Sequence, residues 1–102
     1  MLILPIKKKW FDMILTGEKK EEYREIKPYW RKRFQSIGLL DGCGLPTGFQ
    51  TNVLFQNGYS RQSPKAVASV KLHIAKGRED WGAEKDVDYY VLRITHIDEI
   101  LT

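Results

Sequence analysis

The sequence predicts an α+β fold in which a small, mostly antiparallel sheet curls into a β-barrel and one or two helices flank that barrel. Three observations lead to this fold class. The chain has 102 residues, a length that fits one compact domain. Only one segment has a clear helical spacing of apolar residues, whereas several short segments bounded by turn residues are extended in character. Two of the latter, 66–75 and 89–97, alternate over a long stretch as half-buried strands do.

Each element follows from a local signal. In chain order, the expected elements are a strand over 2–6, a helix over 10–16, an extended segment over 20–26, one or two helical turns over 29–34, and strands over 52–56, 66–75 and 89–97. Pro5 places the first strand towards a sheet edge, because proline cannot donate a ladder hydrogen bond. Gly17 suits a left-handed cap that ends the first helix, and Pro28 disfavours helix at the residue before it. Asn57-Gly58 predicts a tight turn.

Two segments are expected to be loops. Residues 39–48 are rich in glycine and turn formers, and residues 76–88 are charged and contain Trp81. Trp81 is then either a lid over a site or an anchor for its own loop. On the last strand, His96 has the same parity as Ile94, so we expect His96 to be partly buried.

Composition excludes several classes of protein. No apolar run approaches the roughly 20 residues that a transmembrane helix needs, so we expect no association with a membrane. The run over 1–6 is too short for the apolar core of a signal peptide. The single cysteine, Cys43, excludes an internal disulfide and a multi-cysteine zinc site. We therefore expect a reducing, cytoplasmic location, and we expect neither a metal nor a cofactor.

Positive charge is concentrated in the first third of the chain. Residues 1–33 carry ten Lys and Arg against five Asp and Glu, whereas residues 34–102 carry seven against eight. A basic segment with interleaved aromatic residues suits an anionic partner such as nucleic acid. The alternative is that these cations only solvate a helix face.

One short stretch places several charged residues around a helix–glycine–strand turn. Gly17 brings Lys19 to the start of the following strand, where Glu22 and Arg24 lie on one face. Lys7, at the end of the first strand, joins them if the two strands are neighbours. These four side chains would line a cleft that can hold a phosphate or the polar edge of a base. The alternative is a set of surface ion pairs that contribute little to stability.

The order of these residues resembles the N-terminal signature of ASCH domains, which are small β-barrels related to PUA domains. The matching residues are Ile6-Lys7, Trp10, Ile14-Leu15, Gly17-Glu18-Lys19, Glu22 and Arg24. The resemblance covers residues 5–24 and implies a single PUA-like domain over 1–102, with a cleft between the helix–strand turn and the barrel. It also implies RNA binding or a role in RNA-related processes, with Lys7, Lys19, Glu22 and Arg24 as the cleft residues.

Some small ASCH-like proteins resemble amidohydrolases that remove acyl groups from modified cytidine. They use a lysine after the glycine turn, a threonine three positions later and a glutamate further on. Lys19 matches the lysine, but Glu22 stands at the threonine position, so the hydroxyl nucleophile is missing. If the chain is a hydrolase, its candidate catalytic residues are Lys19, as base or polarising cation, and Glu22, as acid or base.

Further residues extend the candidate ligand-binding site. Trp10 is expected in the core or in the wall of the cleft, and Tyr59 and Arg61 follow the Asn57-Gly58 turn, from which they could reach a ligand. The aromatic residues of segment 29–34 lie among arginines and lysines, so they either stack bases or dock a short helix. We favour docking for them.

Three functions remain open from the sequence. The first is binding of RNA or a nucleotide-like ligand through the charged cleft. The second is hydrolysis of an acylated cytidine nucleoside, which requires turnover that depends on Lys19. The third is a protein-interaction domain, which predicts a flat apolar patch in place of a charged cleft.

Overall fold

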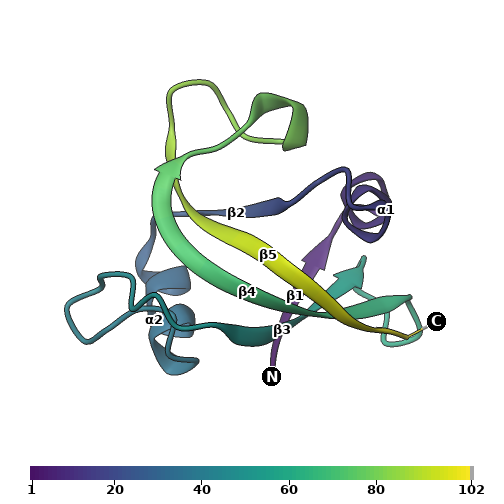
Figure 1. The fold of residues 1–102 in the computed structure, drawn as a ribbon, viewed down its shortest axis with the longest axis horizontal. Coiled ribbons are helices and arrows are strands. Elements are labelled where there is room, and N and C mark those ends of the chain that lie inside the picture. Colours follow the sequence, from purple (N-terminus) through teal and green to yellow (C-terminus); the bar gives the residue numbers. More distant parts are fainter. Residues whose placement is uncertain (102) are drawn as a thin grey trace.

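The computed structural model describes residues 1–101 and has an α+β architecture (Figure 1). In chain order its elements are β1 (Leu2–Ile6), α1 (Lys8–Thr16), β2 (Glu21–Glu25), α2 (Pro28–Ser36), β3 (Thr51–Asn57), β4 (Lys65–Lys76), the 3-10 turn η1 (Glu79–Trp81) and β5 (Asp88–Leu101). Figure 1 shows α1 and α2 at opposite ends of β2, and both helices pack into the same core cluster. None of the described helices is both long enough and apolar enough to cross a membrane.

The strands form one mixed sheet of five, in the order β1-β3-β4-β5-β2. β1 runs parallel to β3, and the other three neighbouring pairs are antiparallel, so the sheet is mostly antiparallel as predicted. The sheet bends strongly along β4 and β5 (Figure 1). Within residues 1–101 its edge strands, β1 and β2, do not pair with each other, so the sheet is open and the expected closed barrel is not confirmed. We call the place where these two edges face each other the seam.

Helix α1 forms where the apolar spacing predicts it, and its end positions Lys19. Phe11 and Ile14 bury the apolar face of the helix in the core. Gly17 has a φ of 82°, and its N–H donates to the carbonyl of Ile14. The N–H of Lys19 then donates to the carbonyl of Met13 at 3.0 Å. This left-handed cap turns the chain so that Lys19 enters the interior just before β2 begins.

Apolar side chains gather in two clusters. The larger cluster joins both helices to the sheet and contains the fully buried Phe34 and Phe55. The smaller one lies against the loop 77–87 and contains Tyr23 and Trp81. Because Trp81 is only 9% exposed, it anchors its own loop, which is one of the two roles expected for it.

Two expectations, one about a residue and one about a helix, change. The prediction that His96 is partly buried is wrong, since 70% of its side chain is exposed. The pairing of β4 with β5 shifts register between Ser69 and Val70, and after this bulge Ile97, rather than His96, packs against the core. The second helix is also longer than predicted, because Pro28 occupies its first turn, where a missing N–H is tolerated.

Candidate functional site

Three charged residues around the start of β2 form a chain of ion pairs, which we call the charged triad: Lys19, Glu22 and Arg24. Lys19 Nζ lies 3.1 Å from Glu22 Oε1, and Arg24 Nη1 lies 3.2 Å from Glu22 Oε2. Glu22 Oε1 also accepts a hydrogen bond from the N–H of Tyr23 at 3.2 Å. Only 0%, 7% and 13% of the three side chains is exposed, respectively. The structure therefore brings the three residues together in a largely buried setting.

Lys19 is held on every side by polar or aromatic groups. Its ammonium donates to the carbonyl oxygen of Trp81, and it lies 4.7 Å from the ring centroid of Trp10 and 5.0 Å from that of Tyr23. Burial lowers the pKa of Lys19 below the usual lysine value, and the carboxylate of Glu22 partly opposes this shift. The carbonyl, the carboxylate and the ring faces compensate the ammonium for lost water. Lys19 thereby ties the α1–β2 turn to the loop that carries Trp81.

Arg24 spans the seam. Its Nη1 donates to the carbonyl of Tyr23 on β2 at 2.7 Å, and its Nη2 donates to the carbonyl of Pro5 on β1 at 3.2 Å. Its Cζ lies 5.1 Å from the ring centroid of Trp30. A guanidinium has more N–H donors than these contacts use, so Arg24 can still donate to a ligand. The side chain of Arg24 thus connects the two edge strands where backbone pairing does not.

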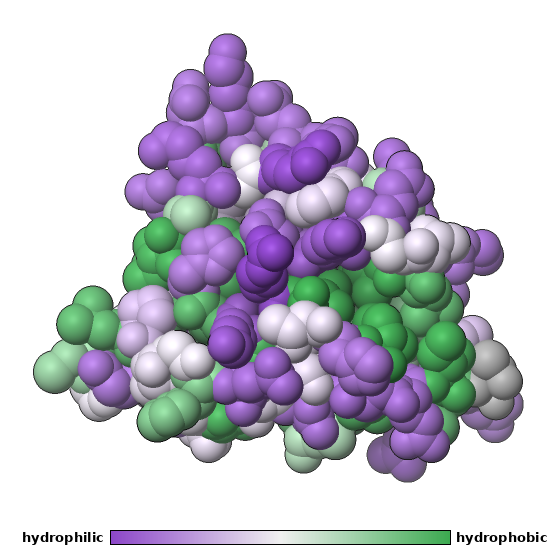
Figure 2. Space-filling model, in the orientation of Figure 1, coloured by the Kyte–Doolittle hydropathy of each residue, from purple (hydrophilic) through white to green (hydrophobic). Residues whose placement is uncertain are grey.

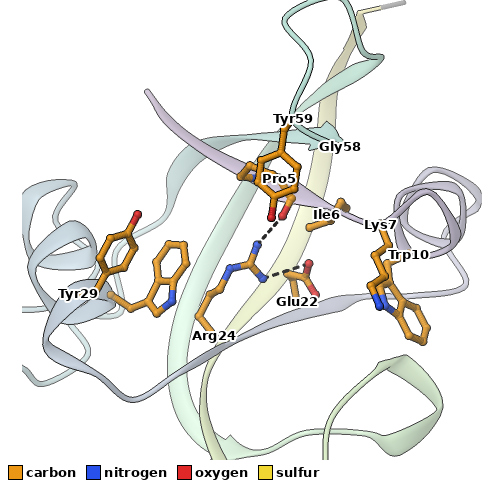
Figure 3. Close-up of a pocket in the computed structure, with 10 residues that line it drawn as sticks. Pro5, Ile6, Lys7, Trp10, Glu22, Arg24, Tyr29, Gly58 and Tyr59 are labelled. Atoms are coloured by element: carbon orange, nitrogen blue, oxygen red, sulfur yellow. Dashed lines mark hydrogen bonds and ion pairs between the residues drawn. The ribbon is translucent and has the colours of Figure 1, made fainter.

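A cavity of about 590 Å³ opens at the seam, and we call it the seam cleft. It is lined by both edge strands, both helices and the turn after β3, through Pro5, Ile6, Lys7, Trp10, Glu22, Arg24, Tyr29, Trp30, Gly58 and Tyr59. Figure 3 shows Arg24 and Glu22 in the middle, with Tyr29 at one end and Trp10, beside Lys7, at the other. The volume lies within the range of about 300–1,000 Å³ that is typical of small-molecule sites.

A second cavity of about 300 Å³ continues from the seam cleft across β2. The residues common to both linings are Trp10, Glu22, Arg24 and Trp30. Glu25 and Glu84 also line the second cavity, and Figure 2 shows a hydrophilic surface over the loop 77–87, which carries Glu84. The combined groove is therefore basic and aromatic at the seam and acidic beyond β2.

Most of the residues predicted for the site line the seam cleft, namely Lys7, Trp10, Glu22, Arg24 and Tyr59. Tyr59 lies at the rim and is 90% exposed. Lys19 is not part of the lining, because it lies behind Glu22 with none of its side chain exposed. Arg61 is also outside the lining and is exposed on the loop that follows Tyr59.

The lining residues that the sequence analysis missed are Pro5, Ile6, Gly58, Tyr29 and Trp30. Trp30 stacks on the buried Phe34, with ring centroids 5.7 Å apart, so it docks α2 as we favoured and also forms a wall of the cleft. Its position among cations was the signal for this second role. Pro5 and Gly58 carry no such signal, because their place in the cleft depends on the pairing of β1 with β3.

The charges of the cleft suit an anionic ligand with a planar group. The charged triad has a formal excess of one positive charge, because two cations flank one carboxylate. Lys7, which is exposed at the rim, adds another positive charge. Cations can bind phosphate, and the aromatic side chains present flat faces or edges to a ring. Among residues 1–101, no group of three or more His, Cys, Asp or Glu is arranged to hold a metal ion.

Comparison with protein-family models, with curated proteins and with solved structures found no match to this chain. The support for a function therefore comes from the geometry and charge of the seam cleft and from the motif around Gly17.

Proposed function

We propose that this chain is an ASCH-like domain of the PUA-like type that binds RNA or a nucleotide-like ligand in the seam cleft. The observation that carries this proposal is a floor formed by Arg24 and Glu22 between aromatic side chains on both helices (Figure 3). A cation and aromatic faces suit an RNA ligand, because proteins hold RNA phosphates with cations and unstacked bases with aromatic faces. The curled sheet would then correspond to the barrel of that family, with the ligand at the seam.

The contacts of the charged triad suggest a role for each member. Arg24 has N–H donors left for a phosphate oxygen or a base carbonyl. Both oxygens of Glu22 already have partners, so Glu22 is a positioning residue that orients Arg24. Lys19 holds Glu22 from behind and makes no direct contact with the cleft. Lys7 binds phosphate at the rim, where its flexible side chain is exposed.

The test is the salt dependence of RNA binding. We expect single-stranded RNA to bind at low salt and to lose affinity linearly on a log–log plot as salt rises, because each bound phosphate releases counterions. The Lys7→Gln variant should weaken binding of every sequence and reduce the slope by about 0.7, the value for one phosphate contact on a single strand. Titrations by fluorescence anisotropy at several salt concentrations measure both quantities.

The matched control is Lys85→Gln, which removes another exposed lysine, from the loop 77–87, outside the seam cleft. It should leave both the affinity and the slope close to those of the unmodified protein. Failure of the unmodified protein to bind any single-stranded RNA at low salt would reject the proposal. An equal loss in Lys7→Gln and Lys85→Gln would assign binding to net charge and would reject the cleft as the site.

A second candidate function is hydrolysis of an acylated cytidine nucleoside, and the Lys19–Glu22 pair favours it. A buried lysine whose pKa is lowered is suited to accept a proton, and Lys19 would do so through Glu22, the cleft-lining carboxylate with which it pairs. Glu22 would then activate a water molecule through the lone pair of Oε2 that Arg24 leaves free, since no threonine hydroxyl stands at its position.

Incubation with a panel of acylated cytidines, followed by product analysis, tests this second function. Turnover should be lost in Glu22→Gln and in Lys19→Met if the pair is catalytic. Retention of turnover in both variants would assign the activity to a contaminant, and no turnover by the unmodified protein across the panel would leave binding as the function.

We also propose a reducing, cytoplasmic location. Cys43 is exposed, and the sequence contains no second cysteine with which it could pair within the chain.

A further inference from the structure

The seam cleft contains two separate aromatic platforms. Trp10 extends from α1 at one end, and Tyr29 extends from α2 at the other. The Tyr29 ring packs against that of Trp30. Arg24 and Glu22 lie between the two ends (Figure 3). One base therefore cannot lie on both platforms at once.

The platform on α2 consists of two aromatic side chains, Trp30 and Tyr29, that are held in place differently. Trp30 lies between Phe34 and Arg24, so it forms a rigid wall. The rings of Tyr29 and Trp30 pack nearly perpendicular to each other, with centroids 4.9 Å apart, and Tyr29 remains 54% exposed. The exposed part of Tyr29 can therefore take a stacked base once the guanidinium of Arg33, which lies over the ring, moves aside.

A flexible cation rests on each platform. The ammonium of Lys9 lies 4.7 Å from the ring centroid of Trp10, and the guanidinium of Arg33 lies 3.4 Å from that of Tyr29. Long, flexible cationic side chains therefore already contact both rings. A base can displace these side chains, and the displaced cations then remain close to its phosphate.

The charge pattern determines where a nucleic-acid backbone can run. Arg24 lies between the platforms and Lys7 lies beside Trp10 (Figure 3). In contrast, Glu25 and Glu84 line the adjoining cavity; Lys27 pairs with Glu25 at 2.6 Å and offsets its charge, whereas Glu84 repels phosphate. A strand is therefore kept within the seam cleft, with a phosphate near Arg24.

We infer that the seam cleft takes single-stranded RNA and holds at least two successive nucleotides, with one base at Trp10, the next at Tyr29 and the phosphate between them at Arg24. This inference rests on the proposed RNA-binding function and narrows it from a nucleotide-like ligand to a strand. Duplex RNA is excluded as a ligand, because its bases stack on each other and do not offer free faces.

The test is a length series of adenosine oligonucleotides, measured by calorimetry at one low salt concentration. The probes are adenosine 5′-monophosphate, the 5′-phosphorylated dinucleotide and tetranucleotide, and a blunt RNA duplex. We expect the dinucleotide to bind at least about tenfold more tightly than the mononucleotide, because a second base gains a stacking partner. We expect no comparable binding of the duplex.

Single substitutions assign each base to its platform. Tyr29→Leu and Trp10→Leu should each reduce dinucleotide affinity by about tenfold, and at most one of them should affect the mononucleotide to that extent. Tyr29 is half exposed, so Tyr29→Leu keeps the test informative even if Trp10→Leu does not fold. The matched control is Phe49→Leu, which removes a 70% exposed aromatic ring outside the cleft and should change neither affinity.

The outcomes separate this inference from the proposed function. Equal affinities for the mononucleotide and the dinucleotide would overturn the two-nucleotide arrangement while leaving nucleotide binding in the cleft intact. Equal binding of the duplex would also overturn it. Absence of binding by every probe would reject the proposed function itself, and the inference with it.

Discussion

Lys19 and Tyr23 share one interior site, but burial shifts their protonation equilibria in opposite directions. Burial lowers the pKa of Lys19, because its charged form loses water. Burial also raises the pKa of Tyr23, whose charged form is the phenolate. The Tyr23 hydroxyl donates to Glu21 Oε1 at 2.8 Å and accepts from the N–H of Arg78 at 2.9 Å. Relative to the unfolded chain, folding therefore disfavours the charged form of each residue.

These opposite shifts predict a stability profile with two limbs. As pH rises towards 10.5, the unfolded chain binds a proton that folded Lys19 holds less tightly, so Lys19 makes the free energy of unfolding rise with pH. Above pH 10.0, unfolded Tyr23 loses a proton that the folded residue keeps, so Tyr23 makes the free energy of unfolding fall with pH. Urea unfolding across the alkaline range measures both limbs.

Two variants isolate these limbs. The unfolding free energy of the unmodified protein minus that of Lys19→Met should rise with pH up to about 10.5, the ordinary pKa of lysine. The unfolding free energy of the unmodified protein minus that of Tyr23→Phe should fall with pH above 10.0. A difference that does not change with pH in either comparison would show that the residue titrates as it does in the unfolded chain.

At the scale of an element, the turn from α1 to β2 depends on Gly17. An added Cβ at Gly17 would meet no atom within 4 Å, so its φ of 82° is the only obstacle to a side chain. Gly17→Ala should therefore cost about 1–2 kcal/mol of unfolding free energy through backbone strain, and Gly17→Asn should cost less, because asparagine tolerates this conformation. Thermal and urea unfolding measure both costs.

Gly77 provides the contrasting control, because its difficulty is space. A Cβ there would lie 2.6 Å from the Cβ of Ala83 and 2.7 Å from Cε1 of Tyr23. Gly77→Ala should cost about 1–3 kcal/mol through overpacking, and asparagine should be worse than alanine. Equal losses for Gly17→Ala and Gly17→Asn would contradict the strain explanation of the turn.

The elements also show why some structure is predictable from the sequence and some is not. The apolar spacing of α1 and the cap at Gly17 involve residues within one or two turns of each other, and the prediction for both is confirmed. The bulge near Ser69 depends on how β4 fits β5 across the sheet, and strand parity along β5 alone placed His96 on the wrong face.

At the scale of the whole molecule, Arg24 joins the two ends of an open sheet. Arg24→Met should lower the unfolding free energy by about 2–3 kcal/mol, because it removes charge-assisted hydrogen bonds to Tyr23 and Pro5. It should also speed hydrogen exchange of the β1 amides more than that of the β4 amides, since β1 loses its connection across the seam. Denaturant unfolding and exchange mass spectrometry measure these effects.

The control for this prediction is Arg61→Met, which removes an exposed arginine outside the seam cleft. It should change the unfolding free energy by no more than about 0.5 kcal/mol. Unchanged exchange of β1 in Arg24→Met would contradict the role of Arg24 across the seam, whatever the effect on overall stability.

By itself, the sequence determined the nature of the elements and the grouping of Lys19, Glu22 and Arg24, because capping, alternation and spacing act between near neighbours in the chain. Only the tertiary structure decided that β1 lies parallel to β3, which brings Pro5 and Tyr59 to the same cleft. It also decided that Lys19 lies behind the cleft and that the sheet stays open at the seam. These features depend on pairing and packing between segments far apart in the sequence, and no local pattern encodes them.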